Sequence, residues 1–279
     1  MRLRPLVSFV CAVSALAATV FATQSTPASS APNLNPLIVI WMENHERSSI
    51  VGSSDADYLN AFRNAGRDFT HYYGVTHPSL PNYLAFANGS TNGKQGSDSI
   101  SAGEIPGPTL WKQLSRQRIP WGVYMESMPS VCYSGSSSGD YVLRHNPATP
   151  FASVFDRPKR CANVKPYSMF DVSALPAVSF IAPNLCNDMH DCSIATGDNW
   201  LQARVPAMLA AGAEVLITFD EGSTSTNGGG NIYAAVRGPG IGSSTNTATF
   251  NHYSLLAAIE KRLEVSRLNN AASAAVLPI

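Results

Sequence analysis

Two pairs of polar residues directly follow apolar runs in the sequence, and each pair contains at least one acid; we call them the acidic pairs. Glu43-Asn44 comes after the run LIVIWM, and Asp220-Glu221 comes after the run VLITF. A carboxylate at the end of a buried segment is costly to desolvate, and two such pairs at one edge would repel each other. A divalent cation held by these four side chains would remove the repulsion, because their oxygens suit a hard or borderline metal. The alternative interpretation is that each acid caps the next helix or turn.

A serine between two prolines is the second candidate for chemistry. In the segment THPSLPNY (residues 76–83), Pro78 and Pro81 restrict the backbone on both sides of Ser79, and Pro81 suits the first turn of a helix. Ser79 would then face a helix N-terminus, whose free amides favour a bound phosphate or an ionised Oγ. The alternative is that Ser79 only caps this helix. Ser79 does not lie in the G-x-S-x-G motif of conventional serine esterases, because its neighbours in the sequence are prolines instead of the glycines of that motif.

His190 is the best placed of the six histidines for proton transfer. It lies in the segment DMHD, which follows an apolar run and stands between Cys186 and Cys192. A short closed loop there would hold the imidazole above the end of a strand. His145 and His252 each open a new segment, where a side chain can face a site. The alternative for any single histidine is a purely structural hydrogen-bonding role.

The segments that must position these residues are predicted to form alternating strands and helices. Continuous apolar runs predict fully buried parallel strands at 37–42, 178–182 and 214–219. Helical patterns occupy the intervening sequence, at residues 57–65, 81–87, 109–117, 198–211 and 252–263. This order predicts an α/β fold with a mostly parallel central sheet flanked by helices on both faces. Ligands of such sheets bind beyond the carboxyl ends of the strands, where the acidic pairs lie.

Composition favours a large buried core and a local binding site. The chain has 279 residues, of which 44% are hydrophobic and 14% charged, and its formal net charge is zero. A disordered chain would have low hydrophobicity and high net charge. No cluster of Lys and Arg along the sequence indicates nucleic-acid binding, so we expect no nucleic-acid partner.

The N-terminus has the features of an export signal. Arg2 and Arg4 precede an uncharged apolar stretch, and small residues near position 22 offer a cleavage site. We therefore expect a signal peptide over residues 1–22, a disordered leader over 23–36, and a single secreted domain over 37–279. The alternative, a membrane anchor, is weaker because the stretch is near the minimum spanning length of about 17 residues.

Four cysteines remain once the signal segment, which contains Cys11, is set aside. An even number in an exported chain indicates disulfides, although four cysteines allow three pairings. We favour Cys132 with Cys161 and Cys186 with Cys192, since the second pair closes a short loop and the first closes a polar Gly/Ser-rich segment. A thiolate metal site is the less favoured alternative, because the sequence has no C-x-x-C pair.

Six ordered motifs give the chain a family resemblance that extends over residues 37–263. They are Glu43-Asn44, THPSLPNYLAFANG (76–89), RHNP (144–147), PNLCNDMHDCSIATGDNWL (183–201), ITFDEG (217–222) and NHYSLLAAIE (251–260). The sequence resembles the secreted acid phosphatases of the bacterial and fungal phosphoesterase family, which are relatives of bacterial phospholipase C. The resemblance implies an alkaline-phosphatase-like α/β core, a metal-assisted hydrolysis of phosphate monoesters and a phosphoserine intermediate.

The same resemblance implies a role for each motif residue. Ser79 would be the nucleophile, and His190 the general acid and base. Asn82, His145 and His252 would contact the substrate or lie close to it. The metal ligands would be Asn44, Asp220 and Glu221, with Glu43 as a further ligand or beside the metal.

The resemblance also implies substrates and leaves alternatives open. The expected partners are phosphorylated small molecules or phospholipid head groups, with one or more divalent metal ions of unknown identity. One alternative is a phosphodiesterase or phospholipase C-type enzyme. The other is a non-catalytic exported domain that binds a metal or an anion.

Overall fold

The sheet is built around strand β1 (Leu37–Met42), whose six residues are all fully buried. The computed structural model describes residues 1–3 and 34–279. The expected signal peptide and leader fall mainly on residues 4–33 and therefore lie outside the described residues. Residues 34–279 belong to one compact unit of the chain.

The strands of the described residues form a nine-stranded, mostly parallel sheet. In spatial order they are β11 (Ser244–Asn251), β2 (Arg67–Tyr73), β10 (Ala234–Arg237), β8 (Glu214–Phe219), β1, β7 (Val178–Ala182), β3 (Trp121–Met125) and β6 (Val164–Pro166), with β9 (Asn231–Ile232) beside β2. Neighbouring strands from β8 to β6 are parallel, and only β10 and β9 pair in the antiparallel sense. The uninterrupted apolar sequence of the central strands follows from this position, because helices cover both faces of the sheet.

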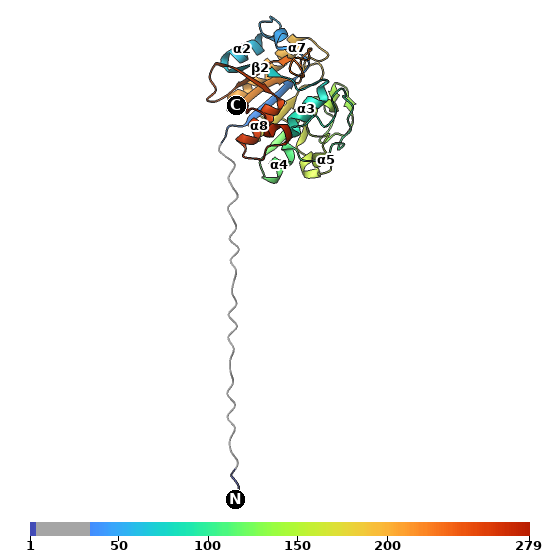
Figure 1. Cartoon of the computed structure of the whole chain (residues 1–279), viewed down its shortest axis with the longest axis vertical. Coiled ribbons are helices and arrows are strands. Elements are labelled where there is room, and N and C mark those ends of the chain that lie inside the picture. Colours follow the sequence, from blue (N-terminus) through green and yellow to red (C-terminus); the bar gives the residue numbers. More distant parts are fainter. Residues whose placement is uncertain (4–33) are drawn as a thin grey trace. The chain divides into compact units, whose positions relative to one another are not determined.

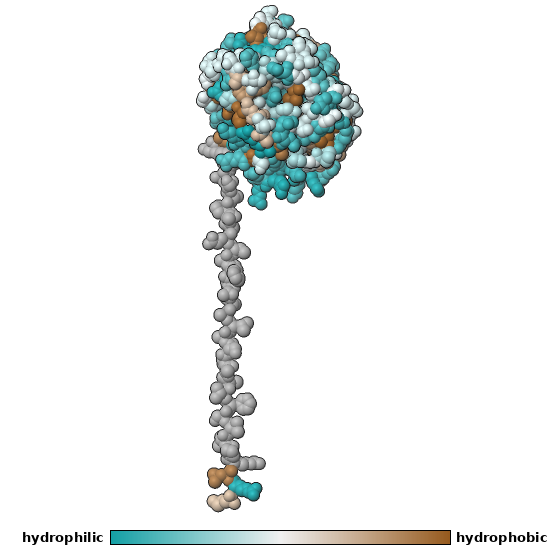
Figure 2. Space-filling model, viewed as in Figure 1, coloured by the Kyte–Doolittle hydropathy of each residue, from teal (hydrophilic) through white to brown (hydrophobic). Residues whose placement is uncertain are grey.

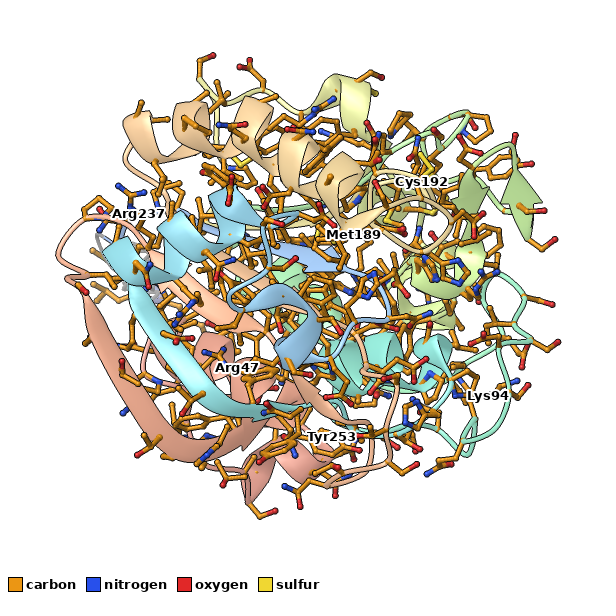
Figure 3. All side chains as sticks on the ribbon, turned by 90° about the horizontal axis from the view of Figure 1, so that it is seen from above. Arg47, Lys94, Met189, Cys192, Arg237 and Tyr253 are labelled. Carbon is orange, nitrogen blue, oxygen red and sulfur yellow. A yellow bond between two sulfur atoms is a disulfide. The ribbon has the colours of Figure 1, made fainter. Side chains whose placement is uncertain are left out.

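The longer helices form two layers, one on each face of the sheet (Figure 1). One layer contains α2 (Asp57–Ala65) and α7 (Ile194–Ala210), which contact each other. The other contains α3 (Ser79–Asn88), α4 (Leu110–Arg116) and α8 (His252–Arg262), in which α3 contacts both of the others. Figure 3 shows α2 and α7 lying across the sheet. Hydrophobic residues on the face in Figure 2 are separated by hydrophilic ones.

Shorter elements complete the connections between strands. The short helices are α1 (Arg47–Ile50), α5 (Ala152–Phe155), α6 (Pro158–Cys161), η1 (Leu143–His145), η2 (Tyr167–Met169) and η3 (Asn269–Ala272). A small hairpin, β4 (Ser137–Ser138) and β5 (Tyr141–Val142), stands apart from the main sheet. Cys132–Cys161 and Cys186–Cys192 form disulfides, which confirms both predicted pairs. No helix within residues 1–3 and 34–279 has the length and apolar character needed to span a bilayer.

The α/β prediction is confirmed, and the three predicted strands match β1, β7 and β8. Two predicted helices begin too late. Helix α7 begins at Ile194 because Ser193 caps it by accepting a hydrogen bond from the Thr196 amide. Helix α3 begins at Ser79 instead of Pro81. Strands β2 and β11 were not predicted, since both mix polar and apolar residues and β11 is largely exposed.

Asn82 fixes the loop that leads into α3. Its Oδ1 accepts hydrogen bonds from the amides of Val75 (2.8 Å) and Thr76 (3.3 Å). Its Nδ2 donates to the carbonyls of Thr76 (2.8 Å) and Pro78 (3.1 Å). The side chain is fully buried. One amide therefore satisfies four polar groups of a partly buried turn and sets where Ser79 begins the helix.

Replacing Asn82 by leucine should destabilise the fold. The side chain keeps a similar volume, but buried backbone groups lose their partners, so we expect a loss of about 2–4 kcal/mol in the free energy of unfolding. Urea denaturation measures this change. The control is Asn64→Leu, on the exposed side of α2, which should change stability by no more than about 0.5 kcal/mol. Unchanged stability in Asn82→Leu would contradict the structural role.

Candidate active site

The two acidic pairs meet at the carboxyl edge of the sheet. Strands β1 and β8 are parallel neighbours, with Met42 opposite Phe219, so the residues that follow them lie side by side. The backbone amide of Asn44 donates a 3.0 Å hydrogen bond to Oδ1 of Asp220. The side chains of Glu43 and Asp220 are fully buried, and Glu221 is almost so.

Burial makes the charged forms of these carboxyls unfavourable. Desolvation raises the pKa of Glu43 well above its ordinary value, and the neighbouring Asp220 and Asp188 raise it further. Desolvation likewise raises the pKa of Asp220, and it raises that of Glu221 to about 9 with a further contribution from Asp220. Only a positive charge at this position would allow all these carboxyls to ionise together near neutral pH.

The Asn44 side chain points its amide into the acidic pair of β8. One terminal atom of this amide lies 3.2 Å from both carboxylate oxygens of Asp220 and 3.2 Å from Oε1 of Glu221. The same atom lies 3.4 Å from Oγ of Ser79. If this terminal atom is Nδ2, the side-chain amide donates hydrogen bonds to the carboxylates of Asp220 and Glu221. If the atom is Oδ1, Asn44 joins the two acids and Ser79 in a set of oxygen donors suited to a hard cation.

Ser79 is the first residue of α3 and lies inside this group of oxygens. Its Oγ donates a 3.1 Å hydrogen bond to Oε2 of Glu43, and the residue is 2% exposed. The neighbouring amide of Leu80 donates to Oδ1 of Asp98 at 2.9 Å. Pro78 is the N-cap residue, and the side chain of Ser79 makes no capping hydrogen bond. The positive end of the helix dipole thus stands beside the hydroxyl.

A second cluster joins the first through Glu43. One potential ligand atom from each of Glu43, His145 and Asp188 lies within 4.8 Å of the other two. His145 stands between the acids, with Nε2 3.4 Å from Glu43 Oε2 and Nδ1 3.4 Å from Asp188 Oδ2. His145 Nε2 and Asp188 Oδ2 are buried without a hydrogen-bond partner. Burial lowers the pKa of His145 to about 3 and raises that of Asp188 to about 7.

These observations fit a site for divalent cations. The neutral imidazole of His145 can act as a metal ligand, and the partnerless buried atoms are of the kind that a metal would satisfy. The predicted ligands Glu43, Asn44, Asp220 and Glu221 lie together, and the structure adds His145 and Asp188 to the groups that could hold a cation.

His190 lies at the rim of the second cluster. Its ring centroid is 5.8 Å from that of His145, and its side chain is 28% exposed. Nδ1 contacts Oδ1 of Asp191 at 2.6 Å, which leaves Nε2 available for a ligand. The backbone amide of His190 donates to Oδ1 of Asp188 at 2.8 Å. Met189 and Cys192, labelled in Figure 3, mark this disulfide-closed loop near the start of α7.

Two predicted substrate-binding residues have other partners in the structure. All four hydrogen bonds of the Asn82 amide go to the loop before Ser79, so direct contact with a phosphate does not fit its geometry. His252 is fully buried, with Nε2 2.5 Å from the carbonyl of Asp220 and Nδ1 3.2 Å from the hydroxyl of Tyr72. Both of its ring nitrogens are therefore used, and His252 supports the Asp220 peptide from behind.

Three residues of the site were not predicted. Tyr83 donates its hydroxyl to Oε1 of Glu43, and its ring stacks on His145 with 5.4 Å between centroids. The spacing of four residues between Ser79 and Tyr83 places both on one helix face and was the available signal. His77 contacts Oε2 of Glu221 through Nδ1 at 2.5 Å, and no sequence pattern indicated that pairing. The third is Asp188, whose position after a buried strand was a usable signal.

Comparison with solved structures places the fold in a known group. A protein of the alkaline phosphatase superfamily from Vibrio parahaemolyticus aligns over 91% of this chain and 72% of its own, with a TM-score of 0.59 and 10% sequence identity. A phosphonate monoester hydrolase from Silicibacter pomeroyi aligns over 88% of this chain and 76% of its own, with a TM-score of 0.55 and 9% identity. At such low identity these likenesses concern the fold alone.

Sequence comparison finds more similar relatives. A phosphate-repressible acid phosphatase from Penicillium chrysogenum is 31% identical over 87% of this chain and 63% of its own length. A phosphatidylinositol-3-phosphatase from Mycobacterium tuberculosis is 30% identical over 84% of this chain and 78% of its own. The chain spans about three fifths of the length of the fungal acid phosphatases that it matches. The model of the Phosphoesterase family matches residues 40–266, and the chain therefore belongs to that family.

Proposed function

We propose that the protein is a secreted, metal-assisted phosphomonoesterase of the acid phosphatase type, which forms a phosphoserine intermediate. The observation that carries the proposal is the position of Ser79 Oγ, at a helix N-terminus and 3.1 Å from a buried carboxylate of an acidic cluster. Similarity to an acid phosphatase and a phosphatidylinositol-3-phosphatase supports hydrolysis of phosphate monoesters, either of small molecules or of phospholipid head groups. The two disulfides support export.

A divalent cation would be held by Asn44, Asp220 and Glu221, with Glu43 between these residues and a second group formed by His145 and Asp188. When bound, a cation there neutralises charge on the phosphoryl oxygens and lowers the pKa of a nearby hydroxyl. The clustering of these buried carboxyls, whose pKa values burial raises, supports a bound cation.

Ser79 supplies the nucleophile. Its Oγ attacks phosphorus while the bond to the leaving oxygen breaks, and the hydroxyl proton passes to Oε2 of Glu43, which already accepts it in a hydrogen bond. Tyr83 donates to the other oxygen of that carboxylate and holds its orientation. The N-terminus of α3 stabilises charge on the equatorial phosphoryl oxygens.

His190 completes the reaction as general acid and base. The contact between Nδ1 and Asp191 orients the ring, so Nε2 can protonate the departing alcohol. The same nitrogen then takes a proton from the water that attacks phosphorus. The phosphoserine bond breaks to release phosphate, and Glu43 returns its proton to Oγ of Ser79. The partial exposure of His190 is consistent with a group that must meet both the leaving alcohol and solvent water.

The Ser79→Ala variant should lose turnover by at least about a thousandfold, because it removes the covalent route. The fold should survive the loss of one hydroxyl, with thermal unfolding as the check. Hydrolysis of p-nitrophenyl phosphate measures the activity, and its bis(p-nitrophenyl) diester tests the diesterase alternative. Ser101→Ala, at an exposed serine, is the control. A folded Ser79→Ala protein with near wild-type turnover would reject Ser79 as the nucleophile.

Removal of metal should abolish activity reversibly. We expect EDTA to inactivate the enzyme and an added divalent cation to restore it, and we expect Asp220→Asn to lower the metal content of the purified protein. Elemental analysis measures bound metal without reference to activity. Asp171→Asn, at a fully exposed carboxylate, should keep wild-type metal content. A metal-free preparation with full activity would overturn this part of the proposal.

His190→Ala should affect substrates according to their leaving groups. Alkyl phosphates need protonation of the departing alcohol, whereas p-nitrophenolate leaves with little help. We expect kcat/KM to fall by about a hundredfold or more for an alkyl phosphate and much less for p-nitrophenyl phosphate, in line with the usual range of general acid catalysis. His71→Ala, at an exposed histidine, serves as the control. An equal loss for both substrates would assign His190 a structural role.

A further inference from the structure

A polar cavity lies next to the candidate active site. It has a volume of about 280 Å³ and is lined by residues 98–100, 136–137 and 142–144. This volume is close to the lower end of the range for small-molecule sites, roughly 300–1,000 Å³. The reaction steps described above assign no role to these residues.

Two residues that line the cavity, Asp98 and Arg144, are attached to elements of the active site and form its inner walls. Asp98 accepts the hydrogen bond from the amide of Leu80, the residue after Ser79, at 2.9 Å. Arg144 directly precedes His145 within η1. The outer wall is the hairpin of β4 and β5, in which Ser137 pairs with Val142. A group that extends from a phosphate at Ser79 toward these walls would enter the cavity.

Asp98 and Arg144 bring opposite charges to the lining of the cavity. The two charged groups are 3.8 Å apart, between Arg144 Nε and Asp98 Oδ2, and both side chains are partly exposed. This separation is at the limit of an ion pair, so both groups keep hydrogen-bonding capacity for a ligand.

The lining of the cavity fits hydroxyl groups. Asp98 offers a carboxylate that accepts hydrogen bonds, Arg144 offers donors, and Ser99, Ser136 and Ser137 offer hydroxyls that can do either. Polar and apolar atoms line the cavity to similar extents, as the hydroxyls and the C–H faces of a hydroxylated ring require. The side chains of Ile100, Val142 and Leu143 are only 9%, 7% and 1% exposed. Such a lining suits a hydroxylated ring better than an acyl chain or an aryl group.

We propose that this cavity binds the alcohol part of the substrate and selects phosphate monoesters of polyhydroxylated rings, such as a sugar or a cyclitol. The proposal rests on the proposed phosphatase function, with the phosphate at Ser79. The ring would lie in the cavity against Asp98 and Arg144, with the β4–β5 hairpin over it. The chemistry is shared by a free cyclitol phosphate and by the head group of a phosphoinositide.

The experiment compares kcat/KM for three substrates. Inositol 1-phosphate and glucose 6-phosphate carry the hydroxylated ring, and p-nitrophenyl phosphate does not. Ser137→Trp fills the cavity, and Arg144→Gln removes its cationic donor. The matched control is Ser134→Trp, which adds the same bulk at an exposed serine of the same loop that does not line the cavity.

We expect the ratio of kcat/KM for the ring phosphates to that for p-nitrophenyl phosphate to fall at least about tenfold in Ser137→Trp and in Arg144→Gln, because a site built to bind hydroxyls loses affinity when its partners are removed. The ratio should be unchanged in Ser134→Trp. A constant ratio in both cavity variants would overturn the proposal, even if total activity falls.

Two further measurements separate the remaining outcomes. A wild-type protein that hydrolyses none of the three substrates would reject the proposed function itself. Activity on p-nitrophenyl phosphate without any preference for the ring phosphates would reject only the cavity proposal.

Vesicles of phosphatidylcholine with phosphatidylinositol 3-phosphate distinguish the two sources of the ring. Sensitivity of vesicle hydrolysis to Ser137→Trp would identify the lipid head group as an occupant, and sensitivity of the soluble phosphates alone would identify the free ring phosphate.

Discussion

The buried carboxyl cluster at the ends of β1 and β8 is the constraint on which the rest of the site depends. Parallel pairing of these strands forces Glu43 next to Asp220, although desolvation disfavours the charged form of each. An apolar pair at these positions would suit the core better, so the cost must be offset by a bound partner. A cation would supply the charge that opposes the carboxylates, and it would in turn attract the negatively charged oxygens of a phosphoryl group. The residues around the cluster act chiefly to keep its geometry.

Helix α3 brings the hydroxyl to that cluster through contacts at both ends of its first turn. Asn82 holds the preceding loop, and Asp98 binds the amide of Leu80, so Ser79 has little freedom to move relative to Glu43. Tyr83, one turn later, reaches the same carboxylate. For the proposed nucleophile, a place on a helix that is packed into the core gives closer positioning than a loop would, and close positioning is a large part of catalysis in phosphoryl transfer.

The sequence allowed prediction of the central fold because the central strands have a strong local signal. Residues 37–42 are apolar throughout, and residues 178–182 and 214–219 are mostly apolar. The polar residues that follow these segments mark the edge where ligands of such sheets bind. Strand β2 and its neighbour β11 lack that signal, because both mix polar and apolar residues and β11 is largely exposed. The roles of Asn82 and His252 could not be read from the sequence for a different reason. Their hydrogen bonds go to backbone groups, whose positions depend on the tertiary fold.

The glycine-rich segment 222–230 shows how tertiary contacts fix a loop that has no charged side chain of its own. Oε1 of Glu46 accepts hydrogen bonds from the amide (3.0 Å) and hydroxyl (2.7 Å) of Thr224, and the amide of Gly229 donates to the carbonyl of Gly74 at 3.1 Å. A Cβ atom on Gly74 would lie 2.6 Å from the Gly229 carbonyl oxygen, so this approach requires glycine. His77 contacts both the Thr224 carbonyl and Glu221. The segment before Ser79 therefore contacts the acidic pair that follows β8 directly. Through His77, this contact fixes the start of α3 relative to Glu221.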